Sequence, residues 1–523
     1  MRRTMGRSKA CGDGAGASGG GRAARRGAAV PLGIGKIAVA ACAAAAAGWW
    51  LFADTVRYHS PTDEAAPLRV SFWGDFEEYK MWQEFRATWL EKHPGVPVKL
   101  EYVAVRYTEK IRQLLVAGAA PDVILFQDEP MPGFLAQGKF EDLSDYLARP
   151  GAEVELSKYW KTSVDSFGRW EDKEGKRSWR QYGIPVWGGC NLILHNREVF
   201  ARAGIRVESR PVATDPQTGK PLSPLPPGLR REGDGWVLND EAWTMDDFVK
   251  LCKMLTADED KDGRIDRFGF WIPGTVYWLP WHWTLGASML DAERRRVTLY
   301  GPECERSLQL WQDLLYKHHV APTPAELGVM GPNVGFMTGR VAMQGTGPWL
   351  MPFLNATDTK YDILHMPRGP DGTRATRITW DAMVLFAGSK KKDQAWRFIC
   401  HLAGPQCQAI LARYQRSIPA LKEAEGAFVG RNPHVATRKF VDALGERRYA
   451  RAQPISEHWD LMMRVWAQAR SGLLGARPQT RLTPAEAIGQ FLCHKELRTK
   501  LPPLDEKQAE RYRVIYRRRG KSK

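Results

Sequence analysis

The sequence predicts an α/β protein with two lobes, each built on a mostly parallel β-sheet. At 523 residues the chain exceeds the usual size of one domain, so at least two lobes with their own cores are expected. From residue 68 onward, short apolar runs alternate with segments of helical periodicity. That alternation is typical of parallel sheets covered by helices.

The alternation begins with a strand over residues 68–73 and a helix over 77–92, whose large aromatic rings share one face. A second strand follows over 96–103. A helix that stops at Gly118 then leads to a buried strand over 123–126. The loops after these strands leave the carboxyl ends of a parallel sheet, where ligands are usually bound.

The segment from Tyr182 to Ile205 is the most informative stretch of the chain. It predicts a short extended entry, a break at Gly188 and Gly189, an apolar strand, and a helix that ends at Gly204. Trp187 would then lie on a glycine-flanked turn between two strands, where an aromatic ring can meet a flat ligand. A packed tryptophan in a linker between lobes explains the same residues, and the segment alone leaves both interpretations open.

Later elements continue the α/β pattern. Residues 206–242 are rich in proline, glycine and polar residues, and they predict an inserted surface loop. Thr244 and Asp247 predict a helix N-terminus through a variant of the capping box. Residues 271–290 carry no formal charge, but their prolines, histidine and five aromatic residues favour a cleft-lining loop and helix over a membrane span. Further strands are expected over 341–343 and 383–387, and further helices over 393–402 and 405–414.

The net charge of +17 is concentrated at the two ends of the chain. Residues 1–36 carry eight Lys or Arg against one acid, and residues 505–523 carry eight against three. The long middle keeps only about +5. Nucleic-acid binding needs basic residues gathered on one folded face, so it is not expected of the globular body.

The N-terminus predicts a membrane topology. The basic residues of 1–36 precede the uncharged stretch 37–53, whose 17 residues are the short end of what spans a bilayer. We therefore expect a cytoplasmic segment at 1–36, a single anchor in the bacterial inner membrane at 37–53, a tether at 54–67, and an extracytoplasmic or periplasmic body. A cleaved signal peptide fits the same pattern, and Cys42 in a lipobox-like context would instead make a lipoprotein. All three alternatives place the body outside the cytoplasm.

The eight cysteines do not form a disulfide framework, because they are widely scattered. Cys252 and Cys400 fall in apolar helical patterns, so buried thiols are expected. No Cys/His spacing in the sequence suggests zinc.

A series of short motifs follows in a fixed order over about residues 68–425. The motifs are Phe72-Trp73-Gly74-Asp75, Ala120-Pro121-Asp122, the 182–205 segment, Trp243-Thr244, Asp262-Gly263-Arg264, Phe336 to Met343, Gly347-Pro348-Trp349 and Ser417-Ile418-Pro419-Ala420. Their order and spacing resemble the bacterial extracellular solute-binding protein family 1, the maltodextrin-binding-like proteins of sugar ABC transporters. Two features depart from that pattern. Trp380-Asp381 stands where many relatives carry a Gly-Gly pair, and the basic C-terminal tail has no counterpart.

The resemblance implies a two-lobe, periplasmic-binding-protein-like fold of type II with discontinuous lobes. The implied bounds are 68–183 with 374–450 for lobe 1, 184–366 with 451–500 for lobe 2, an insert at 206–242, and a basic tail at 501–523. It also implies a monomer that closes on its ligand.

Candidate ligand-binding residues are tryptophans on predicted loops, because an aromatic ring can stack on the apolar C–H face of a sugar. They are Trp73, Trp187, Trp278, Trp281, Trp349 and Trp380. Each of these rings could instead be packed. Asp75, Asp128 and Asp381 follow strands and could bind sugar hydroxyls or act as helix caps and turn acceptors. Gly188 completes the predicted set, and Arg416 is a weaker candidate.

Residues 258–266 match much of a calcium-binding loop. Asp258, Asp260 and Asp262 stand at its first, third and fifth positions, with glycine at the sixth. Position 12 is Gly269 instead of a bidentate glutamate, so weak or no calcium binding is expected and a charged turn is the alternative. No other cofactor is expected.

The sequence lacks P-loop and HExxH signatures, so no enzymatic activity is expected. The resemblance implies a protein that captures a carbohydrate and delivers it to the permease subunits of an ABC-type importer. Two alternatives remain open. One is a membrane-tethered sensor ectodomain on the same fold. The other is a periplasmic carbohydrate-active enzyme, which would need two carboxylates about 5–10 Å apart in its cleft.

Overall fold

The computed structural model describes residues 66–173, 175–271, 274, 277–445, 449–453 and 455–521. The predicted cytoplasmic segment, the anchor and most of the tether lie outside the described residues. Across the described part of the chain, no helix combines the length and the apolarity needed to cross a membrane. The uncharged stretch 271–290 contains, where it is described, the short helix α9 (Leu279–Thr284).

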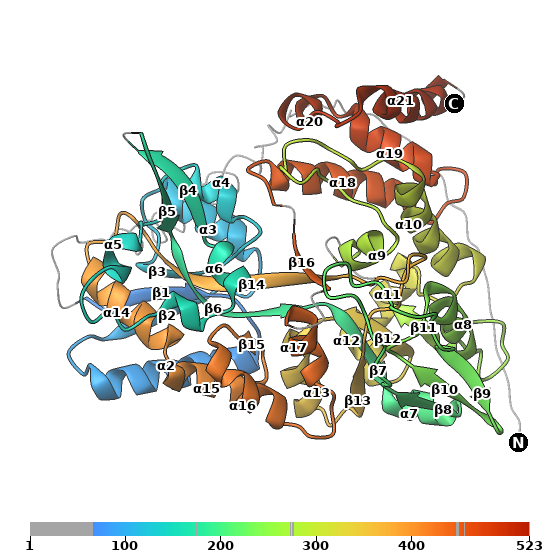
Figure 1. The fold of residues 1–523 in the computed structure, drawn as a ribbon, viewed down its shortest axis with the longest axis horizontal. Helices are drawn as coiled ribbons and strands as arrows, with labels where there is room; N and C mark the ends of the chain where they lie inside the picture. The colour runs from blue at the N-terminus through green and yellow to red at the C-terminus, as the bar shows by residue number, and fades with distance from the viewer. Residues whose placement is uncertain are drawn as a thin grey trace, which may run out of the picture. The chain divides into compact units, whose positions relative to one another are not determined.

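A seven-stranded mixed sheet lies at the centre of the first lobe (Figure 1). Its strands are β1 (Leu68–Phe72), β2 (Val98–Tyr102), β3 (Val123–Gln127), β6 (Gly183–Cys190), β14 (Thr376–Leu385), β15 (Ile418–Pro419) and β16 (Ala450–Ala452). Their order is β15-β6-β14-β3-β1-β2, with β16 paired to β14. β1 is parallel to β2 and β3, whereas β14 is antiparallel to β3 and β6.

Helices cover this first sheet, and a two-stranded ribbon leaves it. The helices are α2 (Phe76–Lys92), α3 (Tyr107–Val116), α4 (Met131–Leu135), α5 (Ser144–Leu147), η1 (Leu156–Lys158), α6 (Lys161–Asp165), α14 (Lys392–Ala403) and α15 (Pro405–Tyr414). The ribbon is β4 (Gly168–Lys173) with β5 (Lys176–Gln181). Trp82 of α2 stacks on Phe72 of β1 with ring centroids 4.4 Å apart, so the aromatic face predicted for this helix is its buried face.

Two further sheets form the second lobe. The strands are β7 (Leu192–Asn196), β11 (Phe268–Trp271), β12 (Val341–Thr346) and β13 (Tyr361–Leu364) in one sheet, and β8 (Ile205–Glu208), β9 (Leu229–Glu232) and β10 (Gly235–Asn239) in the other. β12 is parallel to β11 but antiparallel to β7. The expectation of mostly parallel sheets is therefore wrong, because both main sheets are mixed.

The second lobe contains most of the remaining helices. They are α7 (Arg197–Arg202), α8 (Met245–Leu255), α10 (Pro302–Gln312), η2 (Asp313–Lys317), α11 (Pro324–Met330), α12 (Pro332–Met337), η3 (Pro348–Leu350), α13 (Met351–Ala356), η4 (Lys422–Ala424), α16 (Glu425–Gly430), α17 (Arg438–Leu444), α18 (Trp459–Leu473), α19 (Pro484–Cys493), α20 (Lys495–Lys500) and α21 (Glu506–Lys521). The capping box at the start of α8 is confirmed, since Thr244 Oγ1 accepts from the Asp247 backbone and the Asp247 carboxylate accepts from the Thr244 backbone.

Two sequence predictions about strands are wrong. The insert at 206–242 is not only a loop, because it contains β9, β10 and most of β8; its strands carry ion pairs such as Arg230 to Glu208, at 2.7 Å, which makes them look like loop from composition. The prediction of a break at Gly188 and Gly189 is also wrong, because β6 runs through both glycines. β14 similarly begins at Thr376, well before the predicted strand at 383–387.

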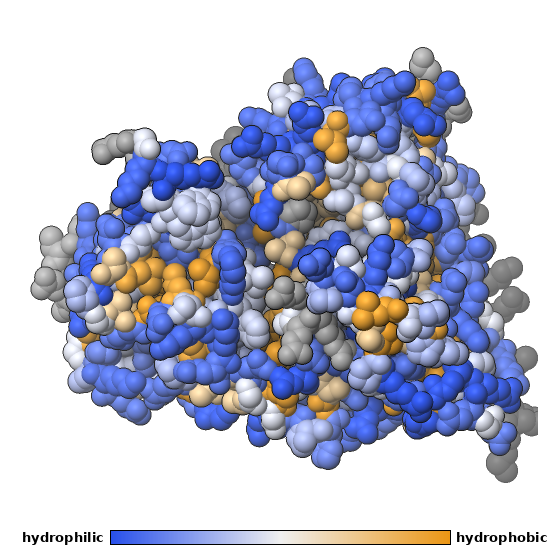
Figure 2. All heavy atoms as spheres, viewed as in Figure 1, coloured by the Kyte–Doolittle hydropathy of each residue, from blue (hydrophilic) through white to orange (hydrophobic). Residues whose placement is uncertain are grey.

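Apolar side chains gather in two large clusters, one for each lobe. Phe428 and Phe440, from α16 and α17, belong to the second cluster. The basic C-terminal tail contains a folded helix, in which Arg513 of α21 is fully buried and pairs with Glu506 and Glu510. Figure 2 shows mainly hydrophilic side chains on one face, with apolar residues in small separate groups.

The six described cysteines are free, and Cys252 and Cys400 are buried as expected.

Candidate functional site

Three segments cross between the two lobes, and together they position the candidate site. β6 runs into β7 through Asn191, β14 returns from the second lobe after β13, and β16 pairs with β14 before the chain enters α18. Figure 1 shows β6 and β14 running side by side from the first sheet toward the second lobe.

Gly188 and Gly189 permit close approach at the first crossing. A Cβ at Gly188 would lie 2.2 Å from Cε3 of Trp380, its partner on β14. A Cβ at Gly189 would lie 2.9 Å from Cδ of Pro348, in the second lobe. The glycines therefore make room for a ring and for the second lobe, and they do not form a turn.

Glu78 and Asp381 are two buried carboxylates beside this crossing. Nε of Arg416 donates to Oε2 of Glu78, and Nε1 of Trp187 donates to Oδ2 of Asp381, both at 2.8 Å. Burial raises the pKa of both carboxyls, although the charge of Arg416 opposes the rise. Oε1 of Glu78 and Oδ1 of Asp381 have no hydrogen-bond partner within the described part of the chain. Buried acceptors without donors are costly, so each of these oxygens can accept a ligand hydroxyl.

Asp128 is a third buried carboxylate, at the end of β3. Its two oxygens accept from Oγ1 of Thr379 at 3.0 Å and from the backbone N–H of Trp380 at 3.2 Å. Burial and the neighbouring charge of Glu129 raise the pKa of Asp128 to about 7. Asp128 therefore changes its charge near neutral pH.

Arg377 joins the three crossings. Its Nε donates to Oδ1 of Asn191 at 3.1 Å, and its Nη1 donates to Oε1 of Glu129 at 2.6 Å. The same glutamate oxygen accepts from Nε2 of Gln453, which follows β16, at 2.5 Å. Sequence reasoning missed Arg377, Glu129 and Gln453, because isolated polar residues near strand ends carry no recognisable pattern.

Half-buried aromatic rings from both lobes lie around these polar groups. In the second lobe, the ring centroids of Tyr277 and Trp349 are 6.2 Å apart, and the guanidinium of Arg377 lies 5.6 Å from the Tyr277 ring. In the first lobe, Trp73 packs against Tyr107 with centroids 4.9 Å apart. Trp73 also lines a cavity of about 220 Å³ at the ends of β1 and β3. These rings keep accessible edges or faces, as ligand stacking requires.

Four other predicted tryptophans are buried in the described structure. Trp187 packs edge-on against Trp82, and Trp380 lies across β6. Trp278 packs on Trp466 with centroids 4.7 Å apart, and Trp281 lies among the rings of the second core. The structure thus shows the packing alternative for each of them, and ligand contact stays a prediction.

Asp75 is exposed and forms the N-cap of α2. Its Oδ1 accepts from the backbone N–H of Glu78 at 2.9 Å. This is the capping role that the sequence left open. Ligand contact by Asp75 stays a prediction.

The acidic loop brings Asp258, Asp260 and Asp262 together as predicted. Each offers one carboxylate oxygen, and these oxygens lie within 4.8 Å of one another. Oδ2 of Asp258 accepts from the Gly263 backbone at 2.9 Å, as it would in a charged turn. Position 12 of the loop, Gly269, lies in β11 and provides no carboxylate, so weak or no calcium binding stays the prediction.

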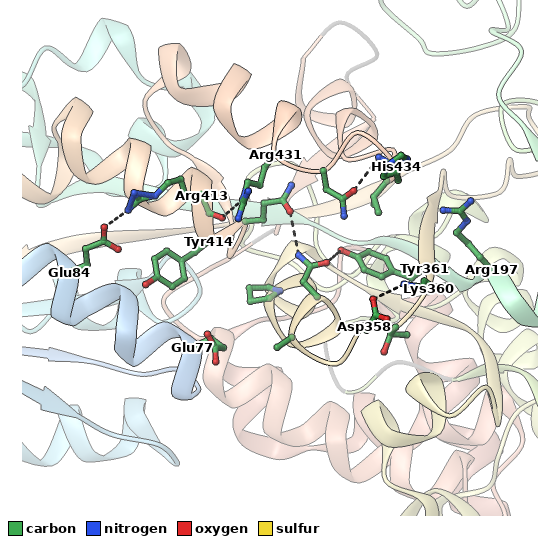
Figure 3. Close-up of a pocket in the computed structure, with 17 residues that line it drawn as sticks. Glu77, Glu84, Arg197, Asp358, Lys360, Tyr361, Arg413, Tyr414, Arg431 and His434 are labelled. Atoms are coloured by element: carbon green, nitrogen blue, oxygen red, sulfur yellow. Dashed lines mark hydrogen bonds and ion pairs between the residues drawn. The ribbon is translucent and has the colours of Figure 1, made fainter.

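A larger cavity of about 1050 Å³ lies between first-lobe and second-lobe helices (Figure 3). α2 and α15 contribute Glu84 and Arg413, which form an ion pair, and α13 contributes Asn355 from the other side. Oδ1 of Asn355 accepts from the hydroxyl of Tyr361 at 2.9 Å. The charged helical residues that line this cavity look like solvated surface in the sequence, so no sequence signal predicted it.

Comparison with known sequences identifies relatives over most of the chain. A sequence profile described as bacterial extracellular solute-binding protein matches residues 73–409. Relatives from Brucella abortus and Brucella suis, named as binding proteins, are 22% identical over 426 residues, which is 79% of this chain and 90% of each relative.

Solved structures share the fold. An ABC substrate-binding protein of Listeria monocytogenes in complex with cycloalternan has a TM-score of 0.66 and 20% identity, covering 80% of this chain and 95% of that one. A maltose-bound protein of T. maritima has a TM-score of 0.62 and 18% identity, covering 86% and 99%. The maltotriose binding protein of Thermus thermophilus has a TM-score of 0.60 and 18% identity, covering 81% and 98%.

Proposed function

The chain belongs to the bacterial extracellular solute-binding protein family, and we propose that it captures a carbohydrate between its two lobes and delivers it to an ABC-type importer. The carbohydrate class is supported by cycloalternan, maltose and maltotriose, which are named for three proteins of the same fold. The delivery step is supported by family membership alone.

One observation carries the carbohydrate proposal: the crossings bring together half-buried aromatic rings and buried carboxylate oxygens that have no hydrogen-bond donor among the described residues. Trp349 and Tyr277 offer ring faces from the second lobe. Glu78 and Asp381 offer unpartnered oxygens from the first lobe. A sugar has apolar C–H faces for the rings and hydroxyl donors for the oxygens.

Binding would be coupled to closure of the lobes. Because Tyr277 and Trp349 belong to one lobe and Glu78 and Asp381 to the other, a ligand that contacts all four favours the arrangement that brings them together. The three crossings supply the hinge, and Arg377 links them. The work of the protein is then differential binding between open and closed states, with no bond broken in the ligand.

Binding of oligosaccharides to the purified full-length chain tests this proposal. We expect maltose, maltotriose or a related glucan to raise the melting temperature in a concentration-dependent way. Trp349→Ala and Tyr277→Ala should each weaken that binding by about tenfold, because a stacking ring is removed. Affinities are measured by isothermal titration calorimetry.

Trp170→Ala is the matched control, because Trp170 is an exposed ring on the β4–β5 ribbon and lines neither the candidate site nor the large cavity. Its affinity should equal that of the unmodified protein. A melting-temperature shift with peptides or polyamines but with no sugar would refute the carbohydrate class. Turnover of a glycan would instead favour the enzyme alternative.

We also propose that residues 37–53 hold the protein in the inner membrane with its body on the extracytoplasmic side. The uncharged stretch after a basic segment supports this topology. Mass spectrometry of the protein from membranes is expected to detect peptides from residues 1–36. A mature N-terminus beyond residue 36 or a lipid on Cys42 would replace the anchor with a cleaved signal or a lipoprotein.

A further inference from the structure

A third cavity, of about 600 Å³, lies in the second lobe and shares no lining residue with the candidate site. One wall is the turn from Thr214 to Gly219, within the inserted segment. The opposite wall includes Arg368, Arg374 and Arg451. Three guanidinium groups therefore line one cavity.

Arg368 is buried, with an exposed fraction of 2%, and among the described residues its side chain donates to backbone carbonyl oxygens alone. Its Nε donates to the backbone oxygen of Glu241, and its Nη1 donates to that of Gly372, both at 2.8 Å. Burial and the charge of Arg374 lower the pKa of Arg368 to about 10, although Tyr449 opposes this fall. A buried cation without an anionic partner is unfavourable, so an anion bound at this wall would stabilise Arg368.

The nearest acids are already engaged. Glu241 accepts from Nη2 of Arg374 at 2.5 Å and lies 3.2 Å from Nε2 of His365. Asp240 accepts from Nζ of Lys439 at 2.6 Å. Each of these carboxylates therefore compensates a cation other than Arg368.

Asp215, which lines the cavity, and Asp371 accept hydrogen bonds within their own turns. Oδ1 of Asp215 accepts from the backbone of Gln217 and Thr218, within its own turn. Oδ1 of Asp371 accepts from the backbone and hydroxyl of Thr373, although its charge still acts on Arg451. Arg451 is exposed and has no ion pair among the residues that the structure describes.

We propose that this cavity binds an oxyanion, a phosphate or a carboxylate group, between Arg368, Arg374 and Arg451. Guanidinium groups present planar pairs of donors that match these two groups. The volume exceeds that of inorganic phosphate, so the group can belong to a larger molecule. Arg374 lies two residues before β14 and Arg451 lies in β16, so the bound anion would contact two of the three crossings.

Anion titrations of the full-length chain without any carbohydrate test this site independently of the proposed function. Inorganic phosphate and citrate are compared with chloride at constant ionic strength, by calorimetry and thermal unfolding. We expect saturable binding and a raised melting temperature with phosphate or with citrate, and neither with chloride. The stronger of the two identifies the oxyanion that the cavity prefers. Equal responses to all three ions would refute the site.

Two substitutions locate the binding. Arg451→Ala should weaken it by about tenfold, because a charge-assisted hydrogen bond is lost from an exposed residue that the fold does not need. Arg368→Met should abolish it. Arg231→Ala, on β9 and outside the cavity, is the matched control and should bind as the unmodified protein does. Unchanged affinity in Arg451→Ala would overturn the proposal, even if Arg368→Met fails to fold.

Discussion

Asp128 is a buried acid whose charge opposes folding at neutral pH. Its pKa rises from 3.8 to about 7 on folding, so the folded protein holds this proton more tightly than the unfolded chain does. The contribution of Asp128 to stability is therefore fully present below about pH 4. It is lost as the pH rises toward 7 and stays lost above it.

Asp128→Asn should remove this pH dependence. Asparagine can accept from the Trp380 backbone and donate to Thr379, so the local hydrogen bonds survive. Relative to the unmodified protein, the variant should gain ~1–3 kcal/mol of unfolding free energy between pH 5 and pH 8. Urea denaturation at the two pH values measures the difference. A constant difference would show that Asp128 ionises normally in the folded protein.

Substitutions at Trp187 and Trp349 should distinguish a packing role from a ligand-contact role. Trp187→Phe leaves Asp381 without its indole donor in a buried site, so we expect a loss of ~1–3 kcal/mol of stability. Its effect on carbohydrate affinity should be smaller than that of Trp349→Ala, whose ring is only half-buried. Denaturation and calorimetry on both variants give the comparison. The reverse order of affinity losses would make Trp187 the ligand contact.

At the scale of elements, α21 docks on α19 at a point where only glycine fits. A Cβ at Gly489 would lie 2.2 Å from the backbone oxygen of Tyr512, which cannot move without shifting α21. Tyr512 also fixes α21 to the second lobe by donating from its hydroxyl to Glu305 at 2.6 Å. The basic tail is thus part of the second lobe.

Gly489→Ala should lower the unfolding free energy by ~1–3 kcal/mol, although alanine normally stabilises a helix over glycine. Gly426→Ala, in α16, has nothing within 4 Å of its new Cβ and should be neutral or stabilising. Thermal unfolding of both variants checks the contrast. Equal effects would mean that α21 is not docked on α19.

Elements with clear local signals could be predicted from the sequence, and those defined by distant partners could not. The helix cap at Thr244 is local, and it is confirmed. β6 carries no local strand signal at its end, because Gly188 and Gly189 serve the approach of Trp380 and Pro348. The site divides in the same way: aromatic rings can be suggested from loop position, but whether a ring is packed or accessible depends on residues far along the chain.

At the scale of the whole molecule, the two lobes meet through the three crossings and the polar groups around Arg377. A ligand held by residues of both lobes should therefore make the protein more compact. Small-angle X-ray scattering with and without a bound oligosaccharide should show a smaller radius of gyration in the complex. Trp349→Ala, which keeps the first-lobe contacts, should need more sugar for the same change. A radius that stays constant at saturating sugar would contradict closure.

The position of β14 also affects how the chain acquires its structure. The backbone N–H of Trp380 bonds to Asp128, 252 positions earlier, and β14 lies between β3 and β6. During synthesis, β3 and β6 are made well before β14, the strand that lies between them. Pairings over such distances form slowly because of the loops they close. The first sheet therefore reaches its native strand order only after most of the chain has been made.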